Sequence, residues 1–178
     1  MTADTNGAVV PAHWVLATRL GELTVVHEGG VLTGLYFPRH WPRPDRAGFG
    51  VRDDRGSEKV ARQLHEYLAG DRSVFDLPID ARGADFDRRV WDLIMQVPYG
   101  QTTTYGDLAR RLGAGTDPRG VGAAVGRNPL CILIPCHRVV GSTGSLTGYA
   151  GGLHRKRQLL RIEQERIARM RQVPAVAR

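Results

Sequence analysis

The sequence holds only two cysteines among its 178 residues, Cys131 and Cys136. Two cysteines cannot form the disulfide framework of a small secreted domain, so the expected compartment is a reducing cytoplasm. No apolar run approaches the roughly 20 residues of a membrane-spanning helix. The first ten residues lack a basic region followed by an apolar one, which argues against a secretory signal.

Lysine is scarce as well. Lys59 and Lys156 are the only two, which leaves arginine as 23 of the 25 basic residues, and the formal net charge is +7. This charge suits binding to a polyanion, of which DNA is the most common. An arginine-rich genome with a solvated protein surface would produce the same balance, and charge alone does not separate the two.

The first half of the chain predicts a small α/β unit. Two runs rich in β-branched and aromatic residues flank Gly29-Gly30, which is typical of a hairpin. A loop rich in proline, glycine and charge leads to an amphipathic helix that Ser57 can cap and Gly70 can end. The expected elements are strands over residues 23–27 and 31–37, a loop over 38–56, a helix over 57–69 and a further strand over 73–79.

The second half predicts helices. Asp85 can cap an amphipathic helix that Pro98 ends. Thr104 and Asp117-Pro118 can cap two short helices joined by a glycine-containing turn, the pattern of a helix-turn-helix. A last helix is expected over residues 153–171. The first of these helices should bury Phe86, Val90, Leu93 and Ile94.

The second short helix is made almost wholly of small residues. Its interior glycines Gly120, Gly122 and Gly126 each cost roughly 1 kcal/mol relative to alanine. Small side chains allow a partner backbone to come close. Taken by itself, this composition favours tight packing between helices, although a narrow DNA groove would impose the same requirement.

The segment with the clearest chemistry places Cys136 directly before His137 and Arg138. A thiol is a strong nucleophile only as thiolate, and a nearby base or cation favours that form. Pro135 places the cysteine where an extended segment ends. Because neighbouring side chains of such a segment point to opposite faces, we expect a water to bridge His137 and Cys136. Cys131 has no adjacent base and is expected to be a buried structural thiol.

Glu163 falls within the apolar stripe of the last predicted helix. Leu159 and Leu160 precede it by four and three residues, and Ile167 follows by four. A carboxylate on such a stripe needs a partner, and the imidazole of His137 would supply one. The alternative is a solvated glutamate at the edge of the stripe.

Three motifs, in this order, closely resemble the O6-alkylguanine-DNA alkyltransferases, DNA-repair proteins that move an alkyl group from guanine onto their own cysteine. They are Pro135-Cys136-His137-Arg138-Val139, Gly148-Tyr149-Ala150-Gly151-Gly152, and Leu159-Leu160 with Glu163. The resemblance covers residues 85–163 well and the preceding part loosely.

The resemblance implies an α/β, ribonuclease H-like N-terminal domain with a small antiparallel sheet and a helix. A mostly α, winged helix-turn-helix-like domain would follow it. We therefore expect a disordered tail over residues 1–12, domains over 13–80 and 85–171, and a second tail over 172–178.

The resemblance also implies catalytic roles. Cys136 would accept the alkyl group, His137 would act as the base through a water, and Glu163 would orient the imidazole. Tyr105 would hydrogen-bond the extruded guanine and help to protonate it, and Asn128 would order the active-site loop. Read without the resemblance, Tyr105 could be a packing residue and Asn128 only a turn former.

The resemblance also implies that the small-residue helix faces DNA and that the DNA contacts lie around it. Arg119 would enter the base stack, although alone it could equally be a phosphate contact or a solvated charge. The family often has serine where Ala150 stands, so one hydrogen bond to the base is in doubt. The implied DNA-binding residues are Arg119, Gly120, Ala123, Ala124, Arg127 and Thr104. The implied base pocket comprises Tyr149, Ala150, Gly148, Val139 and Arg138.

The implied activity is a single-turnover, irreversible transfer from O6-alkylguanine, and less readily from O4-alkylthymine, to Cys136. It would follow minor-groove binding and base flipping. No cofactor and no metal are expected, because the cysteine zinc ligands of some relatives are missing before Cys131. The partner would be double-stranded DNA, bound by a monomer or by monomers clustering cooperatively. The location would be the cytoplasm, associated with the nucleoid.

Two other classes remain open. A cysteine hydrolase would use the same residue types but would not normally place Cys136 and His137 side by side. A DNA-binding protein without transfer activity, either a regulator or an alkyltransferase-like lesion sensor, would not need a reactive cysteine.

Overall fold

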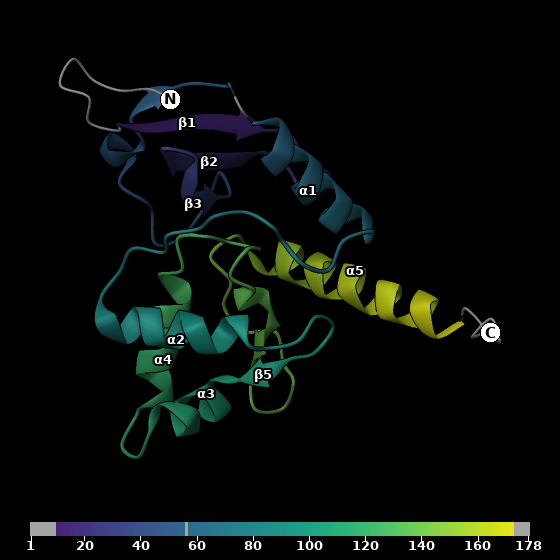
Figure 1. Ribbon diagram of the computed structural model, residues 1–178. Helices are drawn as coiled ribbons and strands as arrows, with labels where there is room; N and C mark the ends of the chain where they lie inside the picture. The colour runs from purple at the N-terminus through teal and green to yellow at the C-terminus, as the bar shows by residue number, and fades with distance from the viewer. Residues whose placement is uncertain (1–9, 56, 173–178) are drawn as a thin grey trace.

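The computed structural model describes residues 10–55 and 57–172, which form the two units visible in Figure 1. The N-terminal unit is a four-stranded sheet with one helix, and the C-terminal unit is mostly helical. This two-domain architecture is the predicted one. Within the described ranges, no helix is both long enough and apolar enough to cross a membrane.

The sheet has the strand order β3-β2-β1-β4. β1 (Pro11–Leu16), β2 (Leu23–Glu28) and β3 (Val31–Tyr36) are antiparallel, and the predicted hairpin joins β2 to β3. Gly29 and Gly30 have φ angles of +57° and +88°, which only glycine adopts without strain. β1 begins at Pro11, inside the expected tail, and the remaining expected tail residues 1–9 lie outside the described part of the chain.

Two expectations for the N-terminal unit were wrong. The segment predicted as a loop contains a short 3-10 helix, Arg46–Phe49, and a strand, β4 (Val51–Arg52), that runs parallel to β1. The strand expected over residues 73–79 is reduced to a single bridge between Ile79 and Leu32. Pro78 supplies only a carbonyl to Leu32, because proline has no N–H with which to extend a ladder.

α1 (Glu58–Ala69) is the predicted helix, but its expected cap was wrong: Ser57 has helical backbone angles (φ −75°, ψ −14°), and its side chain makes no capping hydrogen bond. The helix buries Val60, Leu64, Tyr67 and Leu68 on one face, and Gly70 ends it with a φ of +81°. Arg166 and Arg169 of the last helix both donate to the carbonyl of Gly70, at 2.6 and 3.1 Å. The first helix is therefore tied to the C-terminal unit.

The C-terminal unit contains α2 (Asp85–Met95), α3 (Tyr105–Leu112), α4 (Pro118–Gly126) and α5 (Leu153–Gln172). Thr104 and Asp107 form a capping box at the start of α3, and the Asp117 side chain caps α4, as predicted. The wing is a short parallel pair, β5 (Thr103–Thr104) and β6 (Val139–Val140). α5 extends to Gln172, and the rest of the expected second tail lies outside the described residues.

The buried face of α2 differs from the predicted one. Phe86 is exposed, and Trp91 takes its place beside Val90 and Ile94. The indole N–H of Trp91 donates to the carbonyl of Ala124 at 2.9 Å, so the helix turns to place this side chain against α4. Asp85 is the first residue inside the helix and not its cap.

Candidate active site

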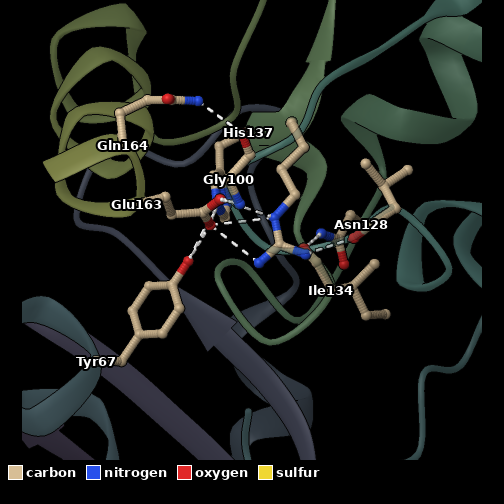
Figure 2. Close-up of polar contacts among 9 residues, drawn as sticks. Tyr67, Gly100, Asn128, Ile134, His137, Glu163 and Gln164 are labelled. Carbon is tan, nitrogen blue, oxygen red and sulfur yellow. Dashed lines mark hydrogen bonds and ion pairs between the residues drawn. The ribbon is translucent and has the colours of Figure 1, made fainter. Parts of the chain in front are cut away.

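The chain before the thiol is held to the N-terminal sheet. Leu35 in β3 donates its N–H to the carbonyl of Pro129 at 2.8 Å and accepts the N–H of Cys131 at 3.2 Å. The Asn128 side chain supports the same segment, because its Nδ2 donates to the carbonyl of Ile134 at 3.0 Å (Figure 2). Its Oδ1 accepts the N–H of Leu130 at 2.9 Å. These two bonds tie the Asn128 side chain to the segment that leads to Cys136, which is the arrangement that the expected ordering of this loop requires.

Ile132 is the one non-glycine residue of the described chain with a positive φ, +74°. A β-branched residue in this region is strained by about 1–3 kcal/mol. Burial of its side chain and a hydrogen bond from the Leu133 N–H to the Cys131 carbonyl, at 2.9 Å, hold it there. After this turn, Pro135 leads into a short 3-10 helix over Cys136–Arg138, and the thiol therefore lies on a tight turn.

Glu163 is fully buried behind this turn, in the network shown in Figure 2. Its carboxylate accepts hydrogen bonds from His137 Nε2 at 2.8 Å, from the Gly100 N–H at 2.7 Å and from the Arg138 guanidinium at 2.9 to 3.1 Å. The solvated-edge alternative for Glu163 was therefore wrong. Arg138 also donates to the carbonyl of Val97 at 2.7 Å, and it faces this network.

Tyr67 of α1 completes the network from the other domain. Its hydroxyl donates to Glu163 Oε1 at 2.5 Å and lies 3.2 Å from His137 Nε2. Tyr67 is fully buried, so the N-terminal domain supplies one of the groups that hold the relay. Sequence analysis placed Tyr67 on the buried face of its helix but could not see this contact.

The protonation states follow from these contacts. Burial would raise the pKa of Glu163, but hydrogen bonds from His137 and Arg138 outweigh it and lower that pKa to about 2. Burial lowers the pKa of His137, and the imidazole is neutral near pH 7. Because an ionised carboxylate only accepts hydrogen bonds, His137 Nε2 carries the proton. Nδ1 is left as the acceptor, and it is buried without a hydrogen-bond partner among the described residues.

The pKa of the Cys136 thiol is lowered, first by a hydrogen bond with the Cys131 thiol and further by Asn128 and the charge of Lys156. The same hydrogen bond, followed by burial, raises the pKa of the Cys131 thiol. Cys131 is buried, as predicted, but it is not chemically isolated: its Sγ lies 3.7 Å from His40 Nδ1. Among the described residues, the His137 ring makes polar contacts with Tyr67 and Glu163 and no hydrogen bond to Cys136.

Lys156 is a site residue that sequence analysis missed. Its ammonium is buried and donates to three carbonyls, those of Val139 and Thr147 at 2.6 Å each and that of Gly148 at 3.0 Å. A compact ammonium with three donors fits such a cluster, whereas a planar guanidinium does not. The signal that could have found it is the retention of lysine here in a chain that otherwise uses arginine. Burial lowers its pKa to about 8.

A cavity of about 550 Å³ opens onto Cys136. The predicted residues that line it are Tyr105, Ala123, Arg127, Gly148, Tyr149 and Ala150. The structure does not bring Arg138 and Val139 into this lining of described residues, because Arg138 faces Glu163 and Val139 is fully buried beneath Lys156. Trp41 and Pro42 line the cavity from the N-terminal domain, which sequence analysis did not foresee.

The predicted DNA-binding residues divide into two groups. Arg119 and Ala123 are exposed on α4, and a Cβ added to Gly120 would meet nothing within 4 Å. Tight helix packing therefore does not explain Gly120, and this face of α4 is open. Ala124, in contrast, is fully buried against Trp91, so a direct contact with DNA is not available to it.

The other two members of the predicted set are already engaged within the protein. Arg127 forms a bidentate ion pair with Asp87, both bonds being 2.7 Å, and Asp87 is buried. The Thr104 hydroxyl donates to the Asp107 carboxylate at 2.8 Å and accepts the Asp107 N–H at 3.0 Å. Both residues therefore brace the helix-turn-helix, although the Arg127 side chain remains about half exposed and lines the cavity.

Known proteins resemble this chain over most of its length. Two family models match the chain: the ribonuclease-like domain of 6-O-methylguanine DNA methyltransferase over residues 13–81, and its DNA-binding domain over residues 85–165. The methylated-DNA–protein-cysteine methyltransferase of Mycobacterium bovis is 43% identical over 147 residues, covering 83% of this chain and 88% of that protein. The inducible enzyme of Bacillus subtilis is 42% identical over 67% of each chain.

Solved structures agree in fold. The O6-methylguanine methyltransferase of Mycobacterium tuberculosis has a TM-score of 0.80 and 40% identity, covering 88% of this chain and 94% of that one. A structure from the same bacterium in complex with DNA also has a TM-score of 0.80, at 40% identity over 87% of this chain and 94% of that one. The chain therefore belongs to the 6-O-methylguanine DNA methyltransferase family, DNA-repair enzymes that transfer an alkyl group to a protein cysteine.

Proposed function

We propose that this chain removes the alkyl group from O6-alkylguanine in duplex DNA by one irreversible transfer to Cys136. The observation that carries the proposal is the position of Cys136. Its thiol opens onto a cavity on one side, and the buried relay of His137, Glu163 and Tyr67 lies on the other.

The transfer needs a thiolate. The Cys136 proton passes through a water to Nδ1 of His137, and Glu163 stabilises the resulting imidazolium through Nε2. Asn128, Cys131 and Lys156 already lower the pKa of Cys136, which reduces the cost of this step. The ionised Glu163 remains unprotonated throughout, as its low pKa requires.

The sulfur then attacks the alkyl carbon. The S–C bond forms as the C–O6 bond breaks, and the electron pair goes to the guanine, which leaves as an anion unless it is protonated. Tyr105 lines the cavity and can donate its hydroxyl proton to this leaving group. A thioether carbon is a poor electrophile, so water does not restore the thiol and each molecule acts once.

The O6 atom lies inside the duplex, so the base has to be extruded into the cavity. Unstacking costs a few kcal/mol, which cavity contacts and an inserted side chain offset. The open face of α4, with Gly120 and Ala123, suits close approach to a minor groove, and exposed Arg119 is the candidate for insertion. An O4-alkylthymine would react less readily, because the smaller base fills the cavity less completely.

The experiment that tests the transfer is the intact mass of the protein after incubation with a duplex containing one O6-methylguanine. We expect a single gain of about 14 Da on the wild type and none on Cys136→Ser. An unchanged mass with lesion-selective binding would make the protein a sensor. An unchanged mass without lesion preference would leave a basic helix-turn-helix protein.

Base extrusion is tested separately with Arg119→Ala. We expect the rate on duplex DNA to fall roughly tenfold or more, because the gap in the stack is no longer filled. The rate with free O6-methylguanine should stay within about twofold, because a free base needs no extrusion. Equal losses on both substrates would rule out the insertion role.

A further inference from the structure

The wall of the Cys136 cavity includes a segment from the other domain. Trp41 and Pro42 follow β3 in the sequence and line the cavity together with residues of α4 and of the loop 148–150. The N–H of Trp41 donates to the carbonyl of Ala150 at 3.0 Å, which joins this segment to the loop. The cavity is therefore closed on one side by the N-terminal domain.

The backbone around Trp41 is held from beneath. His40 is buried, its N–H donates to the Phe37 carbonyl at 3.0 Å, and its ring meets Tyr36 edge-on at 5.0 Å. The Arg155 guanidinium lies 4.6 Å above the Phe37 ring. These contacts fix the direction of the segment, and so the place of the Trp41 side chain at the cavity rim.

Trp41 itself is 73% exposed, the largest exposure among the large apolar side chains described. Burial of a tryptophan strongly stabilises a fold, so the folded protein gains little from this residue. An indole beside a mostly apolar cavity is instead available to a ligand. Gly122, Ala123 and Ala150 make part of the wall small, and the other two aromatic residues of the lining, Tyr105 and Tyr149, are half-buried. Trp41 is therefore the most exposed aromatic surface that the cavity offers to a bulky group.

We propose that Trp41 is a specificity-determining residue that accepts aromatic O6-substituents of guanine, of which benzyl is the simplest, by stacking on their rings. The proposal rests on the proposed function and names a substrate class for the same site. The chemistry is unchanged: the S–CH2 bond to Cys136 forms, the C–O6 bond breaks, and guanine leaves with the electron pair. A methyl group offers no ring for the indole to stack on.

A competing use of Trp41 would be contact with DNA. The indole also borders a neighbouring groove of about 740 Å³ that is lined by Arg39, Arg43 and Arg46. An aromatic side chain among arginines could stack on an unpaired base of the DNA. The cavity role predicts sensitivity to the alkyl group, whereas the DNA role predicts sensitivity to the duplex.

The test measures rates of alkylation of Cys136 for the wild type, Trp41→Ala and Trp41→Phe. The substrates are free O6-benzylguanine and duplexes that carry either O6-benzylguanine or O6-methylguanine. Trp41→Ala should react roughly threefold to tenfold more slowly with both benzyl substrates, and within about twofold of the wild type with the methyl lesion. Trp41→Phe should retain most of the benzyl rate, because a phenyl ring still stacks.

Val51→Ala is the matched control, since Val51 is an exposed apolar residue of the same domain outside the cavity lining. A loss for Trp41→Ala on both duplexes without a loss on the free base would assign Trp41 to DNA and overturn the proposal. Unchanged rates on all three substrates would overturn it too. A wild type that leaves Cys136 unmodified with every substrate would instead refute the proposed function.

Discussion

On one side of the Cys136–Arg138 turn, Glu163 is fully buried and accepts hydrogen bonds from four residues. On the other side, a cavity that combines small residues with aromatic ones opens onto Cys136, and α4 presents an open face. The buried side fixes the proton of His137 on Nε2, because the Glu163 carboxylate that accepts it is itself held by three further donors. The open side leaves room for a substrate that is not part of the chain.

The largest effect is expected from Glu163→Gln, which breaks the buried side. It removes the negative charge beside Arg138 and turns an amide N–H2 towards other donors. We expect the free energy of unfolding at pH 7 to fall by about 3–5 kcal/mol, as for other buried pairs that lose one partner. Urea denaturation measures this, and alkyl transfer should slow at least roughly tenfold as the imidazole loses its orientation.

The pH dependence of the same variant sharpens the test. The folded pKa of Glu163 is depressed from its ordinary 4.5 to about 2. The stabilisation is therefore complete above about pH 4.5 and is lost as the pH falls towards 2. The gap between wild type and Glu163→Gln should narrow over that range. Glu165→Gln, in an exposed pair on the same helix, is the control and should change stability little.

A smaller effect on alkyl transfer is expected from Lys156→Met, because Lys156 binds backbone carbonyls of both the Cys136–Arg138 region and the cavity loop. The substitution removes three hydrogen bonds to carbonyls and the cation that helps to lower the pKa of Cys136. Transfer should slow near pH 7, and the rate–pH profile should move to higher pH. Lys59→Met removes the other lysine, which is in an exposed pair with Asp76, and should change neither. An unshifted profile for Lys156→Met would contradict this role.

Tyr67→Phe tests the contribution of the N-terminal domain to the buried side. Loss of a hydrogen bond to a charged group should lower stability by about 1–3 kcal/mol. Transfer should fall less than in Glu163→Gln, because His137, Arg138 and Gly100 still hold the carboxylate.

Tyr99→Phe is the matched control for that measurement. Tyr99 lies edge-on to Tyr67 with ring centroids 5.8 Å apart, and within the described chain its buried hydroxyl has no hydrogen-bond partner. Both variants delete one buried hydroxyl, but only Tyr67→Phe deletes a hydrogen bond to Glu163. Equal destabilisation by the two would mean that the Tyr67 contact contributes only packing.

The smallest effect is expected on the open side, from Gly120→Ala. The new Cβ meets nothing within 4 Å, so helix propensity should stabilise the fold by up to about 1 kcal/mol. If α4 lies in a minor groove, duplex affinity should fall while the rate with a free base stays the same. Thermal unfolding and duplex titration measure the two effects, and unchanged affinity would remove this position from the DNA interface.

Local patterns in the sequence predicted the elements that local forces determine. The Gly29-Gly30 hairpin, the end of α1 at Gly70 and the helix cap at Thr104 were all confirmed. Each depends on residues within a few positions of one another. The strand expected over residues 73–79 was wrong for the opposite reason, because a strand there needs pairing with the distant β3. Pro78 limits that pairing to one bridge.

By itself the sequence placed Cys136 beside His137 and Arg138 and put Glu163 on the apolar stripe of α5, because each arrangement depends on residues within a few positions of one another. The two-domain architecture followed from the order of the motifs through the family resemblance. Only the tertiary structure decided that Tyr67 bonds to Glu163, that the Lys156 ammonium binds three carbonyls beside the Cys136–Arg138 turn, and that Trp41 lines the cavity. Tyr67 lies 96 positions from its partner Glu163. Such contacts arise when two domains bury their faces together, and no local pattern encodes which distant side chains then meet.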